Sequence, residues 1–200
     1  MALRAEAVRR LLKAISRHPR LGGGAWQVVE MRRESLGPLM EGILASYPWL
    51  RPRLYQTLVA LEEARNNVVL HTGDPMGGIA LVREDTSRKA VDFLFTDDGP
   101  GFLIEGMRPP YAAPMVGRQY DYRRTVDGVV SCTITGPDSI EVAFRPSAVA
   151  SERKAIRRVS SSGLGLSIMA KAMDRVVYLT HVGAGNVLWL RLEAPEEVPA

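Results

Sequence analysis

The sequence is poor in the residues that stabilise extracellular or metal-centred proteins. Its 200 residues include one cysteine and three histidines. A single thiol, Cys132, cannot form an internal disulfide, and its neighbourhood in the sequence offers no cluster of metal ligands. We therefore expect a reducing, cytoplasmic compartment, with Cys132 serving as a small residue inside a strand.

Long apolar runs are also missing from the chain. No segment approaches the roughly 20 apolar residues that a membrane-spanning helix needs. The N-terminus lacks the apolar stretch and the small-residue cleavage site of a secretory signal, so no membrane association is expected. Hydrophobic residues make up 46% and charged residues 24% of the chain, which is typical of a globular protein with a real core. The length suits one domain, or one domain with an added arm.

The excess of positive charge is confined to the N-terminal arm, residues 1–24. The whole chain has a formal net charge of +4, whereas the arm alone has six cations and one anion, or +5. Apolar residues recur at helical spacing over 2–17, which predicts an amphipathic helix. We expect this helix to pack on the domain or on a second subunit of a homodimer. No aromatic residue lies between the arginines, which argues against nucleic-acid binding.

The rest of the chain contains both helical and β-rich patterns. Helices are predicted over 35–47, 53–71 and 163–174, and strands over 26–31, 79–83, 90–96, 129–135, 139–144, 176–181 and 187–193. Residues 102–125 are rich in proline, glycine and tyrosine without a clear period, which predicts a loop. The tail, residues 195–200, is predicted to be disordered.

A carboxylate and an amide share one face of the helix predicted over 53–71. Glu63 and Asn67 lie four residues apart, so both side chains project in the same direction. The amide oxygen of Asn67 is a suitable neutral ligand for Mg²⁺. The carboxylate of Glu63 could orient or deprotonate a nucleophile that attacks a terminal phosphate. An ordinary solvated helix face would also explain this pair.

A second motif, Asp97-Asp98-Gly99-Pro100-Gly101, follows an apolar strand directly. A carboxylate at a strand end can accept a hydrogen bond from an exocyclic amine such as that of adenine. Gly99 and Gly101 would let the backbone turn tightly against a flat ligand. An acidic turn at the end of a strand is an equally good explanation of this motif alone.

A third motif, Gly163-Leu164-Gly165, opens the helix predicted over 163–174. The first N–H groups of a helix have no partner within it, and the helix dipole favours an anion at that end. The motif therefore suits a phosphate group, although a glycine-rich loop with a serine cap would have the same sequence pattern. It lacks the Gly-Lys-Ser/Thr of a Walker A loop, and no strand enters it directly.

Taken together and in this order, the three motifs resemble those of the GHKL ATPase and kinase superfamily, which includes histidine kinases and gyrase. The resemblance covers about residues 25–194. It implies a Bergerat ATP-binding fold, which is an α/β (α+β) two-layer sandwich with a mixed, largely antiparallel sheet and helices on one face. It also implies a mobile lid, here elaborated over 102–162.

The resemblance also implies a role for each motif. Asn67 would hold Mg²⁺, and Asp97 would bind the adenine of ATP. Gly163, Leu164 and Gly165 would lie at the phosphates. Asn186 stands where the family commonly has a threonine that supports the adenine site.

Within the superfamily, the chain looks most like the bacterial anti-sigma factor serine/threonine kinases. In those kinases the residue that matches Glu63 is the base that activates a serine of a STAS-domain anti-anti-sigma partner. Two other functions remain open: nucleotide-dependent sequestering of a sigma factor or other regulator without catalysis, and a stand-alone histidine kinase catalytic domain. His18 would be a poor helical phosphoacceptor because Pro19 follows it.

Overall fold

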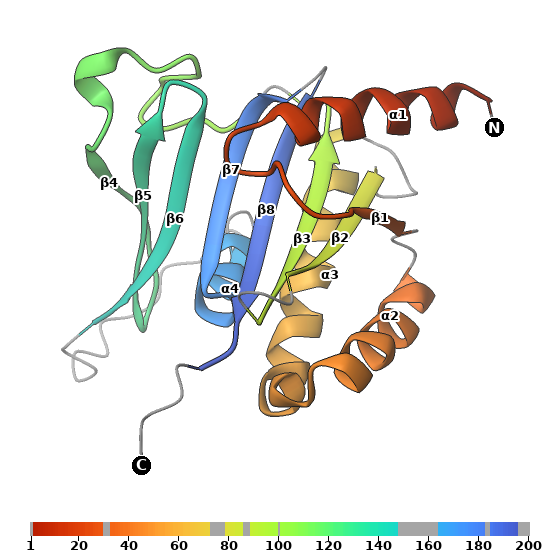
Figure 1. Ribbon diagram of the computed structural model, residues 1–200. Coiled ribbons are helices and arrows are strands. Elements are labelled where there is room, and N and C mark those ends of the chain that lie inside the picture. Colours follow the sequence, from red (N-terminus) through yellow and green to blue (C-terminus); the bar gives the residue numbers. More distant parts are fainter. Residues whose placement is uncertain are drawn as a thin grey trace.

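The protein is an α/β sandwich built on one eight-stranded sheet (Figure 1). The structure is a computed structural model that describes residues 2–29, 33–72, 79–85, 89–99, 101–147, 164–182 and 185–195. The helices are α1 (Ala2–Arg17), α2 (Arg33–Ser46), α3 (Leu54–Thr72) and α4 (Leu164–Ala172), with short 3-10 helices η1 (Pro48–Arg53) and η2 (Ala113–Met115). The strands are β1 (Gln27–Val29), β2 (Ile79–Asp85), β3 (Ala90–Asp97), β4 (Gln119–Arg124), β5 (Gly128–Gly136), β6 (Ser139–Pro146), β7 (Arg175–Val182) and β8 (Gly185–Glu193).

The strand order in the sheet is β1-β2-β3-β8-β7-β6-β5-β4. All seven pairings between the described strands are antiparallel, so the prediction of a largely antiparallel sheet is confirmed. The last two strands of the chain lie at the centre, between β3 and β6. This insertion places Asp97, at the end of β3, directly opposite Asn186 on β8.

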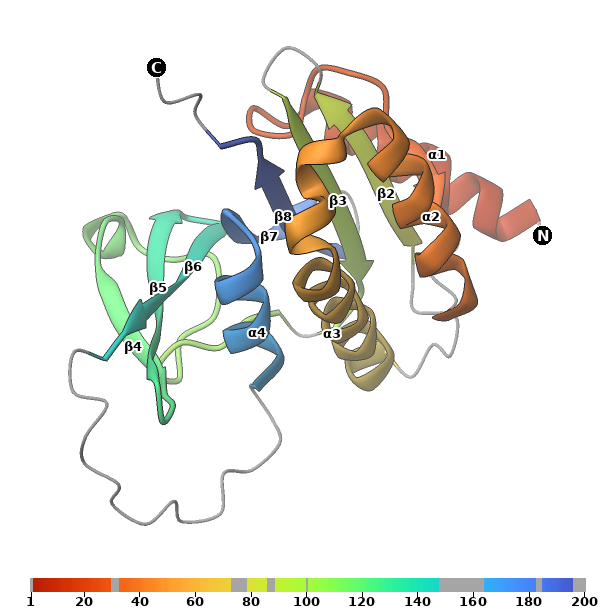
Figure 2. The ribbon, with the colours of Figure 1, turned by 90° about the horizontal axis from the view of Figure 1, so that it is seen from below.

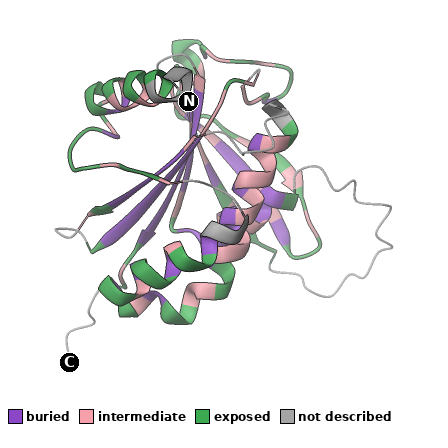
Figure 3. Ribbon diagram, turned by 90° about the vertical axis from the view of Figure 1, so that its right-hand side faces the viewer, coloured by how far each residue is buried: buried purple, intermediate pink, exposed green. Residues whose placement is uncertain are grey.

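Side-chain alternation along the strands produces two separate cores. Figure 3 shows that buried residues gather in the strands of the sheet. On β3, Phe93 and Phe95 face the core beneath α2, α3 and α4, whereas Leu94 faces the other side of the sheet. There α1 lies across the strands, opposite the other three helices (Figures 1 and 2). Ile15 and Leu21 are fully buried in this second core. The N-terminal arm therefore packs on its own domain, one of the two arrangements expected from the sequence.

Much of the segment predicted as a lid, residues 102–162, belongs to the sheet. The predicted hairpin is confirmed as β5 and β6, and it extends the sheet because β6 pairs with β7. Alternate residues of β5 (Val130, Cys132 and Ile134) are buried in the core, which explains why the hairpin docks. β4 lies within the predicted loop. As a polar edge strand with no fully buried residue, it has no apolar alternation that would reveal it. Residues 148–162 lie outside the described part of the chain.

No helix within the described residues has the length and apolarity that crossing a bilayer would require. Most of the tail predicted to be disordered, residues 196–200, lies outside the described residues.

A network of buried charges joins the loop after α1 to the sheet. Asp92 is fully buried and accepts hydrogen bonds from Arg83 Nη2 (2.7 Å), from Trp189 Nε1 (2.8 Å) and, more weakly, from Arg191 Nη1 (3.4 Å). The other end of the Arg83 guanidinium donates to the carbonyl oxygens of the loop, at 3.0 Å from Leu21 and 2.6 Å from Gly23. Arg83 therefore connects the buried carboxylate to the backbone that follows α1.

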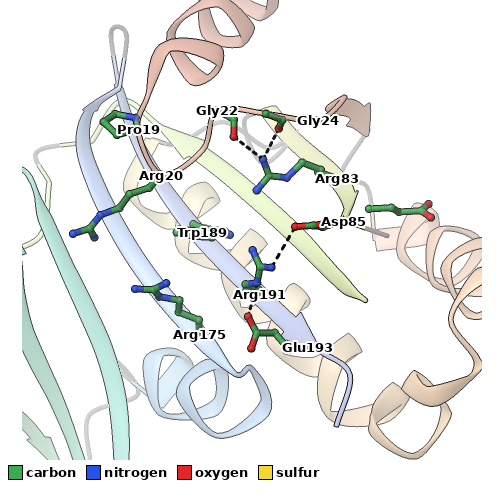
Figure 4. Close-up of a pocket in the computed structure, with 12 residues that line it drawn as sticks. Pro19, Arg20, Gly22, Gly24, Arg83, Asp85, Arg175, Trp189, Arg191 and Glu193 are labelled. Atoms are coloured by element: carbon green, nitrogen blue, oxygen red, sulfur yellow. Dashed lines mark hydrogen bonds and ion pairs between the residues drawn. The ribbon is translucent and has the colours of Figure 1, made fainter. Parts of the chain in front are cut away.

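A polar cavity of about 690 Å³ lies above this network, on the α1 side of the sheet (Figure 4). Its lining carries both signs of charge: Arg20, Arg83, Arg175 and Arg191, with Glu84, Asp85 and Glu193. Arg175 pairs with Glu141 at 2.9 Å, and Arg191 pairs with Glu193 at 2.7 Å. Most of these charges are matched within the protein, and Arg83 on this lining binds the loop after α1.

Replacing Asp92 should destabilise the fold strongly. Asp92→Ala leaves Arg83 and Arg191 buried without their shared carboxylate, and breaking a buried ion pair in this way costs about 3–5 kcal/mol. The free energy of unfolding in urea measures the effect. Glu41→Ala, on the exposed side of α2, is the control and should change that free energy by no more than about 0.5 kcal/mol. Equal effects of the two substitutions would contradict the role given to Asp92.

Cys132 should be unreactive in the folded protein. Burial raises the pKa of its thiol to about 12, so almost no thiolate is present at neutral pH. A thiol reagent such as dithionitrobenzoate should label it only after denaturant is added. The unfolded thiol ionises near its ordinary pKa of 9.0, so the contribution of Cys132 to stability is complete below that pH and is lost as the pH rises toward 12. Rapid labelling of the native protein would contradict this prediction.

Candidate functional site

Two of the motifs found in the sequence meet where α4 begins. Glu63 and Asn67 are partly buried on α3, and Gly165 is buried in the first turn of α4. A Cβ atom added to Gly165 would lie 2.8 Å from Oε2 of Glu63 and 3.5 Å from Nδ2 of Asn67. Glycine therefore lets α4 approach the two polar side chains without displacing the end of Glu63. Leu164 is the exposed first residue of α4, and Gly163 lies outside the described residues.

The position of Glu63 and Asn67 follows from the apolar face of α3. Leu61, Ala64 and Val68 are buried against the sheet at spacings of three and four residues. Glu63 and Asn67 fall beside this face, on the side that α4 approaches.

Arg53, at the end of η1, fixes the other end of α4. Its guanidinium donates at 2.7 Å to the carbonyl of Ala172, the last residue of α4, and pairs at 2.7 Å with Asp174. A cation at a helix C-terminus interacts favourably with the helix dipole. Arg53 therefore holds α4 alongside α3, so that the first turn of α4 reaches Glu63.

The second cluster surrounds Asp97 at the end of β3. Asp97 Oδ1 accepts hydrogen bonds from the backbone N–H of Gly99 at 2.8 Å and from Nδ2 of Asn186 at 3.0 Å. The hydroxyl of Tyr178 donates to Oδ2 at 3.3 Å. Asn186 also donates to the carbonyl of Gly99 at 2.9 Å. Asn186 therefore supports both the carboxylate and the turn that follows it.

Strand parity puts this cluster on the same side of the sheet as α3 and α4. Asp97 is two residues from Phe95, Asn186 two from Leu188 and Tyr178 two from Val176, and all three apolar residues face the core beneath the helices. The Asp97 cluster and the Glu63 cluster thus lie on one face of the protein, as a ligand spanning them would require.

Two glycines allow the strand ends to approach each other. A Cβ at Gly185 would lie 2.6 Å from the carbonyl oxygen of Asp97, which would prevent the pairing of β3 with β8 at this point. Gly101 has a φ of +81°, a conformation that side chains with a Cβ rarely adopt, and it packs near Thr180 and Asn186. The glycine at the end of the Asp-x-Gly-x-Gly motif is therefore required by its backbone geometry.

The arrangement of these residues fits ATP and Mg²⁺. A carboxylate whose position is fixed by internal donors can accept a hydrogen bond from the amine of adenine. The first N–H groups of α4 suit phosphate oxygens. Within the described residues, no three histidine, cysteine or acidic side chains form a metal site. Mg²⁺ would therefore depend on the amide of Asn67, together with phosphate oxygens and water, which is how this ion is often held beside a nucleotide.

A comparison with protein families identifies the chain. The sequence profile of the histidine kinase-like ATPase domain matches residues 2–192. The chain belongs to this family. A search of curated proteins gives no match. An ATPase domain implies ATP binding, usually with Mg²⁺. The matched range begins at residue 2 and therefore includes α1.

The histidines give little support to a phosphoacceptor within this chain. Nδ1 of His18 accepts a hydrogen bond from the backbone N–H of Arg20 at 3.3 Å. His18 directly follows α1, the helix that lies on the face of the sheet opposite α3 and α4. Burial, with a smaller contribution from Arg20, lowers the pKa of His18. His181, on β7, is exposed, and its Nδ1 lies 3.4 Å from Oδ1 of Asp138. The side chain of His71 lies outside the described residues.

One residue of the Asp97 cluster, Tyr178, was missed by the sequence analysis. Its strand, β7, is rich in apolar residues, and a tyrosine in such a strand is usually part of the core. A possible signal was the alternation itself, which places Tyr178 on the same face as Val176. Finding its partner required the register of β7 against β8 and of β8 against β3.

Gly165→Ala should impair nucleotide binding more than folding. The new methyl group would push the flexible end of Glu63 away from α4 or displace α4 itself, and misplacement of a binding group by about 1 Å can cost affinity or rate by tenfold or more. We expect the ATP affinity, measured by calorimetry, to fall by about tenfold.

Gly42→Ala is the matched control for this substitution. Gly42 lies within α2, and the space that its Cβ would occupy has no neighbouring atom within 4 Å. The substitution should therefore leave ATP affinity unchanged and raise the free energy of unfolding by up to about 1 kcal/mol. Unchanged ATP affinity in Gly165→Ala would show that the contact with Glu63 does not matter for the nucleotide.

Proposed function

We propose that this chain is an ATP-dependent protein kinase that phosphorylates a serine or threonine of a STAS-type regulatory partner, as anti-sigma factor kinases do. The observation that carries the proposal is the state of Glu63. Its carboxylate lies beside the first turn of α4 and makes no hydrogen bond or ion pair with any other residue in the described part of the chain. Such a carboxylate is available to a reacting group.

In the proposed reaction, Glu63 accepts the proton of the partner's hydroxyl group. The serine or threonine oxygen forms a bond to the γ-phosphorus, the bond between that phosphorus and the β–γ bridging oxygen breaks, and ADP leaves with the electron pair. The N–H groups of Leu164 and Gly165 have no partner four residues earlier in the helix, and they donate to phosphate oxygens. Asn67 would hold Mg²⁺, which would offset the charge of the phosphates.

The test is Glu63→Gln, which keeps the size of the side chain and removes its basicity. We expect transfer of labelled phosphate from ATP to a STAS-domain protein of the same genome to fall by about 10²–10⁴-fold, the usual contribution of a general base. The ATP affinity, measured by calorimetry, should stay within about twofold, because the defect lies in the chemical step.

Glu62→Gln is the control, since Glu62 neighbours Glu63 on α3 but lies within ion-pair distance of Arg65, at 3.7 Å. It should transfer phosphate as the unchanged protein does. Full activity in Glu63→Gln would refute the role of Glu63. If the unchanged protein binds ATP and never transfers phosphate, while nucleotide alters its affinity for a partner, the protein is a nucleotide-dependent binding protein instead. Acid-labile phosphate on a partner histidine would indicate a histidine kinase.

A further inference from the structure

The two oxygens of the Asp97 carboxylate have different numbers of partners. Oδ1 accepts from two donors, Gly99 N and Asn186 Nδ2. Oδ2 accepts only from the Tyr178 hydroxyl among the described residues. An ionised carboxylate has about four positions for donors, two on each oxygen. Oδ1 is therefore saturated, and the position that remains for a ligand is on Oδ2, beside Tyr178.

Tyr178 is suited to hold this carboxylate in a fixed orientation. Burial, together with the neighbouring Asp97 carboxylate, raises the pKa of Tyr178 well above its usual range, so the hydroxyl keeps its proton and remains a donor. The ring of Phe102 packs against Tyr178 at a centroid distance of 5.6 Å and against Tyr122 at 4.9 Å. Phe102 thus restricts the Tyr178 ring from the side of the turn that follows Asp97.

We propose that Tyr178 is a positioning residue for adenine recognition: its hydroxyl orients Asp97 so that the free position of Oδ2 accepts the 6-amino group of the base. The inference rests on the proposed nucleotide-binding function and adds a residue to it. A carboxylate held by donors on both oxygens cannot rotate to offer its saturated side. Selection of a base that carries an amine therefore depends on Tyr178 as well as on Asp97.

The test compares two nucleotides that differ only in that amine. ATP carries the 6-amino group, and purine riboside 5′-triphosphate has a hydrogen in its place. Calorimetry on the full chain gives the ratio of the two affinities. The unchanged protein should prefer ATP, and Tyr178→Phe should lower its affinity for ATP by about fivefold, in line with the loss of one modest hydrogen bond. Its affinity for the nucleotide without the amine should hardly change.

Tyr122→Phe is the matched control. Tyr122 belongs to the same aromatic group as Tyr178, but none of the contacts described for it involves Asp97, so its substitution should leave the affinity ratio unchanged. Asp97→Asn should bring the ratio close to one, which shows the full size of the effect. The thermal unfolding midpoint of each variant reports whether the fold is retained.

Three results would overturn the inference. An equal loss of affinity for both nucleotides in Tyr178→Phe would mean that the residue only supports the fold. Unchanged affinities for both nucleotides would mean that Asp97 needs no help from Tyr178. Absence of ATP binding by the unchanged protein would remove the inference together with the nucleotide function. Because every readout is a binding ratio, a lack of phosphotransfer would count against the proposed kinase activity alone.

Discussion

The antiparallel pairing of β3 with β8 is the constraint on which the rest of the structure depends. The two strands are far apart in the sequence, and their register brings Asp97 opposite Asn186 and Asp92 opposite Arg191. The first pair lies on the side covered by α3 and α4, and the second lies on the side covered by α1. A shift of one residue would exchange the faces and separate both pairs.

The same strand therefore serves two purposes through its two faces. Facing α3, Phe93 and Phe95 form the core and lead to Asp97 at the strand end. Facing α1, Asp92 is the buried anion around which Arg83 and Trp189 are arranged. The positions of Asp92 and Asp97 in the sequence differ by an odd number. Because side chains alternate along an extended strand, the two carboxylates point to opposite sides of the sheet. One carboxylate stabilises the fold, and the other is available for recognition.

Local patterns in the sequence were enough to predict some parts of this arrangement. Glu63 and Asn67 share a helix face because they are about one turn apart. The glycines and proline of residues 97–101 indicate the turn that contains Gly101. The features that were missed depend on contacts between distant segments. Tyr178 becomes significant only when β7, β8 and β3 are in register.

The edge of the sheet and the first helix were hard to predict for a different reason. β4 carries a polar sequence, because an edge strand needs little apolar surface, and so its pattern resembles a loop. The amphipathic pattern of α1 showed that this helix packs on something, without showing what. The partner of α1 is the second face of the sheet. There Ile15 and Leu21 share a core with Leu81 and Val177, which come from distant parts of the chain.

The way in which Arg83 holds the loop after α1 has a consequence for how this region can vary between related proteins. The guanidinium donates to the carbonyl oxygens of Leu21 and Gly23, and it also stacks over the ring of Trp26, 4.4 Å from the ring centroid. Gly23 and Gly24 have φ values of +87° and +73°. Selection on this loop therefore acts on the path of its main chain and on Trp26. Substitutions elsewhere that keep the path are tolerated, whereas Gly23, Gly24, Trp26 and Arg83 must change together or remain.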